Sequence, residues 1–286
     1  MSKSDILSVI SSTHEYNFHS HTQFCDGRAS METMTEAAVA AGLKHFGFSP
    51  HSPVPIDSHC NMSAADVAAY LAEVGRLREI YGSRIRLYSG MEIDFLGEKW
   101  GPSDDFFRSL PLDYRIGSVH FIPSQDGMEI DVDGRADSFI RKMHEWFHDD
   151  IRYVVDTFFN RSLEMIAAGG FDILGHFDKI GGNASAFSPD IVSEPFFRRH
   201  VDDMIDAILQ SDIIVEVNTK AYEAPVGATV EEIASYHPRL FPSSYAISQL
   251  IRAGVPLVVN SDAHFPDRIV TGRRAAFAVI EAIAQG

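Results

Sequence analysis

The chain has 286 residues and carries 40 Asp and Glu against 24 Lys and Arg, a formal net charge of −16. With 45% hydrophobic and 22% charged residues, the composition excludes a disordered chain, a collagen and a coiled coil. The acidic balance argues against nucleic acid as a partner, because a phosphate backbone needs a basic surface. It fits metal ions or a cationic small molecule better.

Cysteine usage and hydropathy indicate a cytoplasmic protein. Cys25 and Cys60 are too few for a disulfide framework. The first sixteen residues lack the basic start and long apolar core of a signal peptide. The apolar run 275–280 is too short to cross a bilayer. We therefore expect no membrane partner, and the sequence leaves a homodimer open.

Short apolar runs alternate with longer helical patterns along the chain. The strand candidates are Tyr16–His19, His45–Ser49, Arg86–Glu92, Tyr114–His120, Ile173–His176, Ile213–Asn218 and Leu257–Ser261. The helix candidates are Ser30–Ala41, Ala64–Tyr81, Asp137–Ala168, Pro189–Gln210, Ser243–Ala253 and Thr271–Ala284. Such alternation predicts parallel crossovers in an α/β fold. Seven units favour a closed or nearly closed barrel, and an open doubly wound sheet is the alternative.

Local signals refine these boundaries. Gly42 and Gly254 follow their helices where C-cap glycines are expected. The pattern 137–168 is too long for one ordinary helix, so we predict a break near residues 149–150. The turn-rich segment 124–134 is predicted to be a surface loop.

Most of the strand candidates finish in a side chain that can bind a metal ion. The sequences His19-Ser20-His21 and Asp262-Ala263-His264 each place two such side chains at i and i+2, on one face of a strand. The full candidate set is His19, His21, Asp26, His51, Glu92, His120, His176, Asp262 and His264. Because the carboxyl ends of barrel strands converge on one face, we expect these side chains to form one cluster.

The size of this set predicts more than one ion. At about three to four protein ligands for each catalytic metal, the set suits two or three divalent ions. It contains no thiolate, so a closed structural zinc site is not indicated. Histidine and carboxylate ligands accept zinc, manganese, iron or cobalt, and the sequence leaves the metal open.

These motifs resemble the PHP (polymerase and histidinol phosphatase) family of metal-dependent phosphoesterases, from His19 to about His264. Within that family the chain is most similar to the stand-alone histidinol-phosphate phosphatases. The runs that carry this likeness are Phe24-Cys25-Asp26-Gly27, Gly90-Met91-Glu92-Ile93-Asp94 and Gly175-His176-Phe177-Asp178-Lys179. Many relatives place an Asp before the histidine of the second motif, whereas Pro50 precedes His51 here. This difference bears on how His51 is supported.

The resemblance implies a distorted TIM-like barrel of seven βα units, a single domain over residues 1–286, and a trinuclear centre. It implies a first ion on His19, His21, Glu92 and Asp262, a second on Glu92, His120 and His176, and a third on Asp26, His51 and His264. From this set we take Glu92, Asp262 and His176 as the catalytic residues.

Such a centre suits the hydrolysis of a phosphate monoester, which is very slow without a catalyst. The ions would neutralise the phosphate oxygens, and a hydroxide bridging two ions would attack in line. The resemblance points to L-histidinol phosphate as the small phosphorylated substrate, hydrolysed to L-histidinol and phosphate in histidine biosynthesis.

Residues outside the ligand set could contact this substrate. Arginine commonly binds phosphate, so Arg161 and Arg268 are substrate-binding candidates. Asn218, which ends the predicted strand Ile213–Asn218, is a third candidate. The ammonium and imidazole groups of histidinol phosphate would favour an acidic pocket wall. Its candidate residues are Asp94, Glu216 and Glu223.

Three alternatives remain open. A PHP-type phosphoesterase could act on nucleotides or other small phosphate esters instead. The sequence His144-Glu145-Trp146-Phe147-His148 matches the His-Glu-x-x-His motif of zinc proteases, on a predicted helix. The cluster could also belong to a metal-binding module without catalytic activity.

Overall fold

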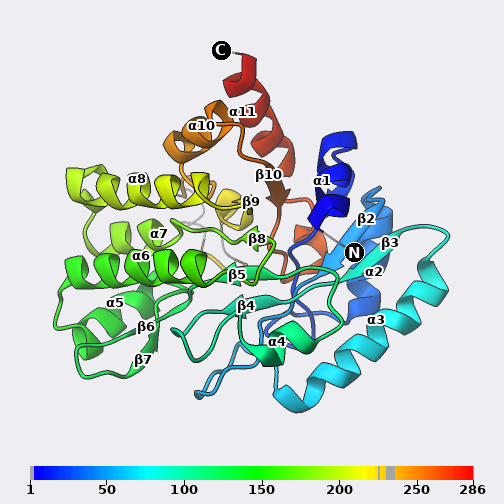
Figure 1. The fold of residues 1–286 in the computed structure, drawn as a ribbon, viewed down its shortest axis with the longest axis horizontal. Helices are drawn as coiled ribbons and strands as arrows, with labels where there is room; N and C mark the ends of the chain where they lie inside the picture. Colours follow the sequence, from blue (N-terminus) through cyan, green and yellow to red (C-terminus); the bar gives the residue numbers. More distant parts are fainter. Residues whose placement is uncertain (1–2, 225, 230–235, 286) are drawn as a thin grey trace.

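The chain folds as an α/β protein in which helices surround short, mostly parallel strands (Figure 1). The computed structural model describes residues 3–224, 226–229 and 236–285. Each predicted strand contains an observed one, and each predicted helix overlaps an observed helix, so the α/β alternation is confirmed. None of the described helices has the length and apolar character needed to cross a bilayer.

The strands form two parallel sheets and one hairpin. The first sheet has the order β1 (Tyr16–Asn17), β2 (His45–Phe48) and β3 (Arg86–Ser89). The second has the order β10 (Leu257–Asn260), β9 (Ile214–Asn218), β8 (Ile173–Leu174), β5 (Ile116–Ser118) and β4 (Glu92–Asp94). The antiparallel hairpin joins β6 (Phe121–Pro123) to β7 (Glu129–Asp131).

The helices follow the strands in the expected alternation. The longer ones are α1 (Lys3–Ser12), α2 (Met31–Ala40), α3 (Val67–Tyr81), α5 (Ala136–Trp146), α6 (Ile151–Ala168), α7 (Ile180–Phe187), α8 (Pro195–Leu209), α10 (Ser244–Arg252) and α11 (Arg273–Gln285). The short ones are η1 (Ala64–Asp66), α4 (Asp105–Ser109), η2 (Ile191–Ser193), η3 (Lys220–Tyr222) and η4 (Pro266–Arg268).

Single bridges connect the two parallel sheets. Ser20 pairs with Ala263 beyond β1 and β10, and His51 pairs with Glu92 beyond β2. Because regular pairing is interrupted at both places, the strands pair as two sheets and not as one continuous closed sheet, whereas the sequence favoured a closed or nearly closed barrel.

The predicted strand 86–92 is divided into β3 and β4 because the chain passes tightly over Tyr114. A side-chain carbon on Gly90 would lie 2.2 Å from the Tyr114 ring carbon Cζ, so only glycine fits there. The Tyr114 hydroxyl donates a hydrogen bond of 2.5 Å to the Phe18 carbonyl, which ties this strand break to the end of β1.

Two local predictions are confirmed and one is wrong. The break in 137–168 lies between α5 and α6, where Asp150 caps α6 by accepting a hydrogen bond from the Tyr153 N–H. Gly42 and Gly254 have φ values of +82° and +74°, as helix-ending glycines do. The segment 124–134 is not simply a loop, because its middle forms β7, and Ile130 of that strand is buried.

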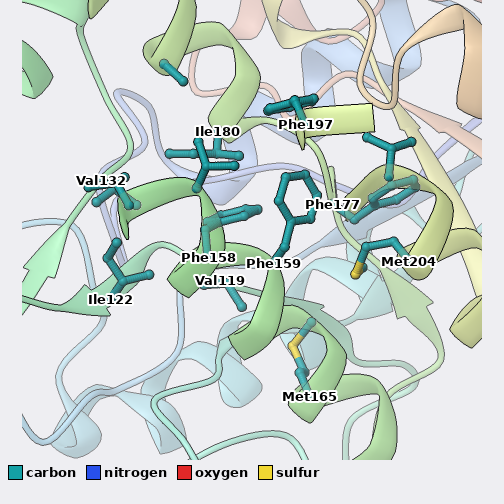
Figure 2. Close-up of a cluster of buried hydrophobic side chains, with 14 of the residues drawn as sticks. Val119, Ile122, Val132, Phe158, Phe159, Met165, Phe177, Ile180, Phe197 and Met204 are labelled. Carbon is teal, nitrogen blue, oxygen red and sulfur yellow. The ribbon is translucent and has the colours of Figure 1, made fainter. Parts of the chain in front are cut away.

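Buried side chains fill both sides of the sheets. The largest cluster packs α5 to α8 onto the second sheet, and Figure 2 shows Phe158 and Phe159 of α6 at its centre. A second cluster joins inward-facing residues of both sheets beneath α1. It contains Tyr16, Phe18, Tyr88, Tyr114, Ile116, Ile173, Ile214 and Val258. This interior cluster forms the floor on which the strand ends rest.

Replacing Gly90 with alanine should destabilise the fold, because the added methyl group would overlap the buried Tyr114 ring. We expect the free energy of unfolding in urea to fall by about 1–3 kcal/mol. Gly75 is the matched control, since it lies inside α3 with open space around it. Gly75→Ala should leave stability unchanged or raise it by up to about 1 kcal/mol. Equal stability of the two variants would contradict this account of the strand break.

Candidate metal centre

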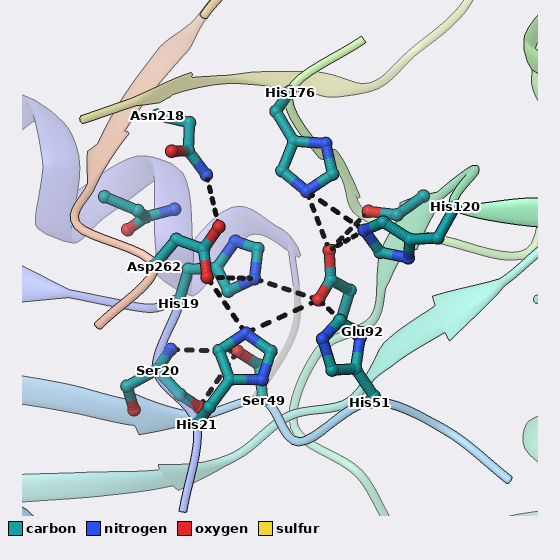
Figure 3. A network of polar contacts seen from close by, with 12 residues as sticks. His19, Ser20, His21, Ser49, His51, Glu92, His120, His176, Asn218 and Asp262 are labelled. Atoms are coloured by element: carbon teal, nitrogen blue, oxygen red, sulfur yellow. Dashed lines mark hydrogen bonds and ion pairs between the residues drawn. The ribbon is translucent and has the colours of Figure 1, made fainter. Parts of the chain in front are cut away.

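Nine side chains meet where the parallel strands end, and Figure 3 shows most of them from close by. They come from segments directly after β1, β2, β5, β8 and β10, and from the start of β4. They form four overlapping groups, in each of which the potential ligand atoms lie within 4.8 Å of one another. The nine are His19, His21, Asp26, His51, Glu92, His120, His176, Asp262 and His264. The structure thus brings together the whole predicted ligand set.

Glu92 lies at the centre of this cluster, and its carboxylate faces two sets of imidazoles. Its Oε2 atom is 3.2 Å from His19 Nε2 and 3.1 Å from His51 Nδ1. Its Oε1 atom is 3.0 Å from His176 Nε2 and 3.4 Å from His120 Nε2. Glu92 is only 1% exposed. A carboxylate with a different set of ligands at each oxygen is suited to bridge two cations.

Asp262 and Asp26 extend the cluster on the side of β10. Asp262 Oδ1 lies 3.1 Å from His21 Nε2. Asp26 Oδ2 lies 3.1 Å from His264 Nε2, and Asp26 Oδ1 lies 3.8 Å from His51 Nε2. The ring of His21 stacks on that of His264 at 4.0 Å, so these two imidazoles line the same space.

Two buried carboxylates hold the cluster histidines from behind. Glu216 Oε1 accepts a hydrogen bond of 2.6 Å from His19 Nδ1, and Asp94 Oδ1 accepts one of 2.7 Å from His120 Nδ1. The expectation that Glu216 and Asp94 line a substrate pocket is therefore wrong. They fix the imidazole orientation and leave Nε2 directed into the cluster, which raises the basicity of that nitrogen.

A sequence signal for these two carboxylates exists but was missed. Glu216 interrupts the apolar run of β9, and a charged residue inside a buried strand must have partners. Its Oε2 accepts hydrogen bonds from the His176 N–H and the Asn218 side chain, and its Oε1 accepts another from Asn260. Asp94 stands two residues after Glu92, at the same-face spacing of a strand.

The surroundings move the pKa values of neighbouring histidines in opposite directions. Burial lowers the pKa of His19, but the carboxylates of Glu216 and Glu92 outweigh it and leave that pKa well above its ordinary value. Burial and the nearby His264 and His51 rings hold the pKa of His21 well below the ordinary range. His21 is therefore neutral at pH 7, the form in which a histidine binds a metal.

Several buried atoms of the cluster lack a hydrogen-bond partner. Among the described residues, these atoms include His19 Nε2, His21 Nε2, Asp26 Oδ1 and Glu92 Oε2. Leaving buried polar groups unsatisfied is costly. His19 Nε2 and His21 Nε2 lie 3.2 and 3.5 Å from Glu92 Oε2, and Asp26 Oδ1 lies 3.6 Å from His21 Nδ1. Neutral imidazole nitrogens and carboxylate oxygens are the donor set that divalent cations prefer. The residues present therefore fit divalent metal ions.

The predicted substrate residues lie in different places. Asn218 is at the cluster, where its side chain donates to Asp262 Oδ2 at 3.2 Å. Arg161 pairs with Glu129 of the β6–β7 hairpin, with 3.0 Å between Nη2 and Oε1. Arg268 forms an ion pair with Glu223. Glu223 is the third residue that was predicted to line an acidic pocket wall, and this ion pair occupies its carboxylate.

Two lysines that the sequence analysis did not single out approach the cluster instead. Lys220 Nζ lies 3.4 Å from Asp262 Oδ1, and Lys179 Nζ lies 3.8 Å from Asp262 Oδ2. Burial lowers the pKa of Lys179, but Asp133 and Asp262 outweigh it and raise the pKa above its ordinary value. Lys179 is therefore charged. Its place in the run after His176 was a signal that could have drawn attention to it.

The zinc-protease alternative is wrong. Helix α5 ends at Trp146, and His148 has a φ of +48°, so the two histidines of the motif do not lie one turn apart on a helix. His144 instead pairs with Asp149 at 2.5 Å, and both side chains are more than half exposed. Within the described part of the chain, neither histidine belongs to a group of three potential ligands.

Comparisons with known proteins agree with the fold and the cluster. A protein of Deinococcus radiodurans named "Probable histidinol-phosphatase" is 24% identical over 268 residues, covering 92% of this chain and 90% of the relative. A solved structure from Listeria monocytogenes has a TM-score of 0.76 and 17% identity, covering 91% of this chain and 99% of the other.

A second solved structure is the histidinol phosphate phosphatase of Lactococcus lactis, complexed with zinc, L-histidinol and phosphate. It has a TM-score of 0.68 and 17% identity, covering 94% of this chain and 93% of the other. The sequence model of the PHP domain matches residues 17–220, from the last residue of β1 to beyond β9. Because this match spans most of the chain, the protein belongs to the PHP domain family.

Proposed function

We propose that the protein is a metal-dependent phosphomonoesterase that hydrolyses L-histidinol phosphate to L-histidinol and phosphate. The observation that carries this proposal is the convergence of nine buried or partly buried side chains with nitrogen and oxygen ligand atoms, four of which lack hydrogen-bond partners. The substrate is supported by the relatives, which are named as histidinol-phosphatases, and by the L-histidinol and phosphate in the Lactococcus lactis structure.

We assign the nine ligands to three ions, with Glu92 shared between the first two. The first ion is held by His19, His21, Glu92 and Asp262, the second by Glu92, His120 and His176, and the third by Asp26, His51 and His264. Divalent zinc, manganese or iron ions would supply Lewis acidity, polarising the ester and activating water. The four overlapping groups of potential ligands support this assignment only in part. His19, His21, His51 and Glu92 each belong to two groups, so the groups alone do not assign these residues to one ion.

The charge of the site favours three ions over two. Six carboxylates and two lysines surround the cluster, which leaves four uncompensated negative charges when the histidines are neutral. These residues are Asp26, Glu92, Asp94, Asp133, Glu216 and Asp262, with Lys179 and Lys220. Two divalent ions would make the site neutral, whereas three would leave it positive, even with a hydroxide bound. A positive site would attract the dianion of a phosphate monoester.

The protein's own residues orient this centre and exclude water from it. Glu216 and Asp94 prevent rotation of the His19 and His120 rings. Glu92, Asp262 and His176, each at most 2% exposed, are the catalytic residues in this proposal because they contact the reacting centre through the ions. Burial strengthens their electrostatic effect, since the local dielectric is low.

We also propose that the two parallel sheets act as one distorted barrel of seven strands within a single domain. Strands β3 and β4 then count as one strand interrupted at Gly90 and Met91. Support comes from the bridges Ser20–Ala263 and His51–Glu92, and from the interior cluster, which combines side chains of both sheets.

Activity should depend on the ions and on Glu92. We expect zinc- or manganese-loaded protein to release phosphate from histidinol phosphate, and a chelator to abolish this release. Glu92→Gln should lower kcat by roughly 1000-fold, because losing ions removes several kcal/mol of transition-state stabilisation. Glu145→Ala is the control and should retain full activity, since Glu145 lies on the separate helix α5.

A substrate panel tests the choice of ester. Histidinol phosphate, sugar phosphates and nucleotides would be compared by kcat/KM in the metal-loaded protein. Faster hydrolysis of a nucleotide would contradict the substrate while leaving the phosphomonoesterase assignment standing. If no phosphate monoester is hydrolysed, the proposed function is wrong.

Removing the carboxylate behind His19 should weaken metal retention. Glu216→Gln would keep the shape of the side chain but lose its charge, and we expect metal affinity to fall about 10- to 100-fold. Asp156→Asn is the matched control, because Asp156 accepts a similar bond of 2.7 Å from His200 far from the cluster. Metal content after dialysis against a chelator, measured by elemental analysis, checks this. Equal retention in both variants would show that Glu216 does not support a ligand.

A further inference from the structure

Two lysines flank Asp262 on opposite sides of its carboxylate. Lys179 lies three residues after His176 and approaches Oδ2 at 3.8 Å. Lys220 lies two residues after Asn218 and approaches Oδ1 at 3.4 Å, with His264 Nε2 at 3.3 Å. The two ammonium groups therefore come from neighbouring strand ends, β8 and β9, and converge on the same carboxylate.

Lys179 is held in position by its surroundings. Its side chain is only 15% exposed, and Nζ donates a hydrogen bond of 2.8 Å to Asp133 Oδ2. A small cavity of about 10 Å³ adjoins it and is also lined by His120, Asp133 and Ile180. This volume is about that of one water molecule. The lysine therefore borders a water-sized cavity beside a candidate metal ligand, His120.

Fixed positive charges beside a cation site need an explanation. An ammonium group within 4 Å of a ligand carboxylate competes with a metal ion for that carboxylate and repels the ion. This cost is offset when an anion binds between the lysines and the ions, because the anion attracts both.

The arginines that the sequence favoured do not fill this role. Glu129 and the Phe121 carbonyl occupy the guanidinium of Arg161, and Glu223 occupies that of Arg268. The lysines thus supply the positively charged side chains that the structure places next to the cluster.

We propose that Lys179 and Lys220 bind the phosphate group of the substrate, and that Asp133 is the positioning residue for Lys179. This proposal rests on the proposed phosphomonoesterase function. The two lysines contribute charge and hydrogen-bond donors to phosphate oxygens, and no covalent step passes through them.

The test compares Lys179→Gln and Lys220→Gln with the wild type, all loaded with metal. Binding of inorganic phosphate is measured by calorimetry, KM and kcat are measured with histidinol phosphate, and metal content is measured by elemental analysis. We expect each substitution to weaken phosphate binding and raise KM by roughly 10- to 100-fold, as for a charge-assisted hydrogen bond. Metal content should not change, and Lys179→Arg should recover most of the phosphate affinity.

Lys142→Gln is the matched control. Lys142 also pairs with an aspartate, Asp131, at 3.0 Å, and its side chain is 22% exposed, but it lies on α5. The Lys142→Gln variant should bind phosphate with the same affinity as the wild type. Asp133→Asn should raise KM by a smaller factor than Lys179→Gln, since it frees the ammonium group without removing it.

Several outcomes would overturn the proposal. Unchanged phosphate affinity in both lysine variants would do so, as would a wild type that binds no phosphate. Tighter metal binding with unchanged phosphate affinity would show that the lysines only balance charge. Lys220 is 37% exposed, so Lys220→Gln still tests the proposal if Lys179→Gln does not fold. Phosphate binding that depends on the lysines without hydrolysis of any ester would instead refute the proposed function, and the two lysines would remain only a phosphate-binding pair.

Discussion

The burial of many carboxylates in one place is the constraint on which this structure depends. Glu92, Asp262 and Glu216 are each at most 2% exposed, and their negative charges lie close together. Such an arrangement is unfavourable without cations or donors, because charges repel strongly where water is absent. Imidazoles satisfy part of the requirement, but four buried atoms without hydrogen-bond partners show that they do not satisfy all of it. The cluster therefore calls for metal ions on energetic grounds, independently of any resemblance.

The same constraint shapes the strands. Regular backbone pairing between the strands stops short of the cluster, and the side-chain amides of two asparagines complete the pairing. Asn260 Oδ1 accepts a hydrogen bond of 2.8 Å from the Phe18 N–H, and Asn17 Oδ1 accepts one of 2.8 Å from the Ser261 N–H. Asn260 also donates to Glu216. These two asparagines link β1 to β10 and tie that link to the carboxylate that orients His19. The junction between the sheets and the candidate centre are thus one hydrogen-bonded unit.

Sequence patterns predict strand ends well and side-chain partners poorly, for a physical reason. The convergence of the nine candidate ligands could be predicted because parallel strands bring their carboxyl ends together wherever the exact boundaries fall. The role of Glu216 could not be assigned in the same way, because a carboxylate in a strand is compatible with a pocket wall and with a support behind a ligand. Arg161 shows the same difficulty, since its partner Glu129 lies in a hairpin that the sequence predicts as loop. Long-range pairing decides these roles, and no local pattern encodes it.

The geometry after β10 shows how a correct prediction can rest on an incomplete reason. Asp262 and His264 were expected to share a face through strand alternation, but β10 ends at Asn260. Asp262 has a φ of +48°, a left-handed conformation that Asp tolerates better than most residues. His264 Nδ1 then lies 3.0 Å from the Asp262 carbonyl oxygen, so a tight turn rather than a strand directs both side chains inward. Strained backbone of this kind persists where the surroundings fix the chain. Here the Ser20–Ala263 bridge fixes Ala263, which lies between Asp262 and His264. The i, i+2 spacing of metal ligands is therefore compatible with two backbone conformations.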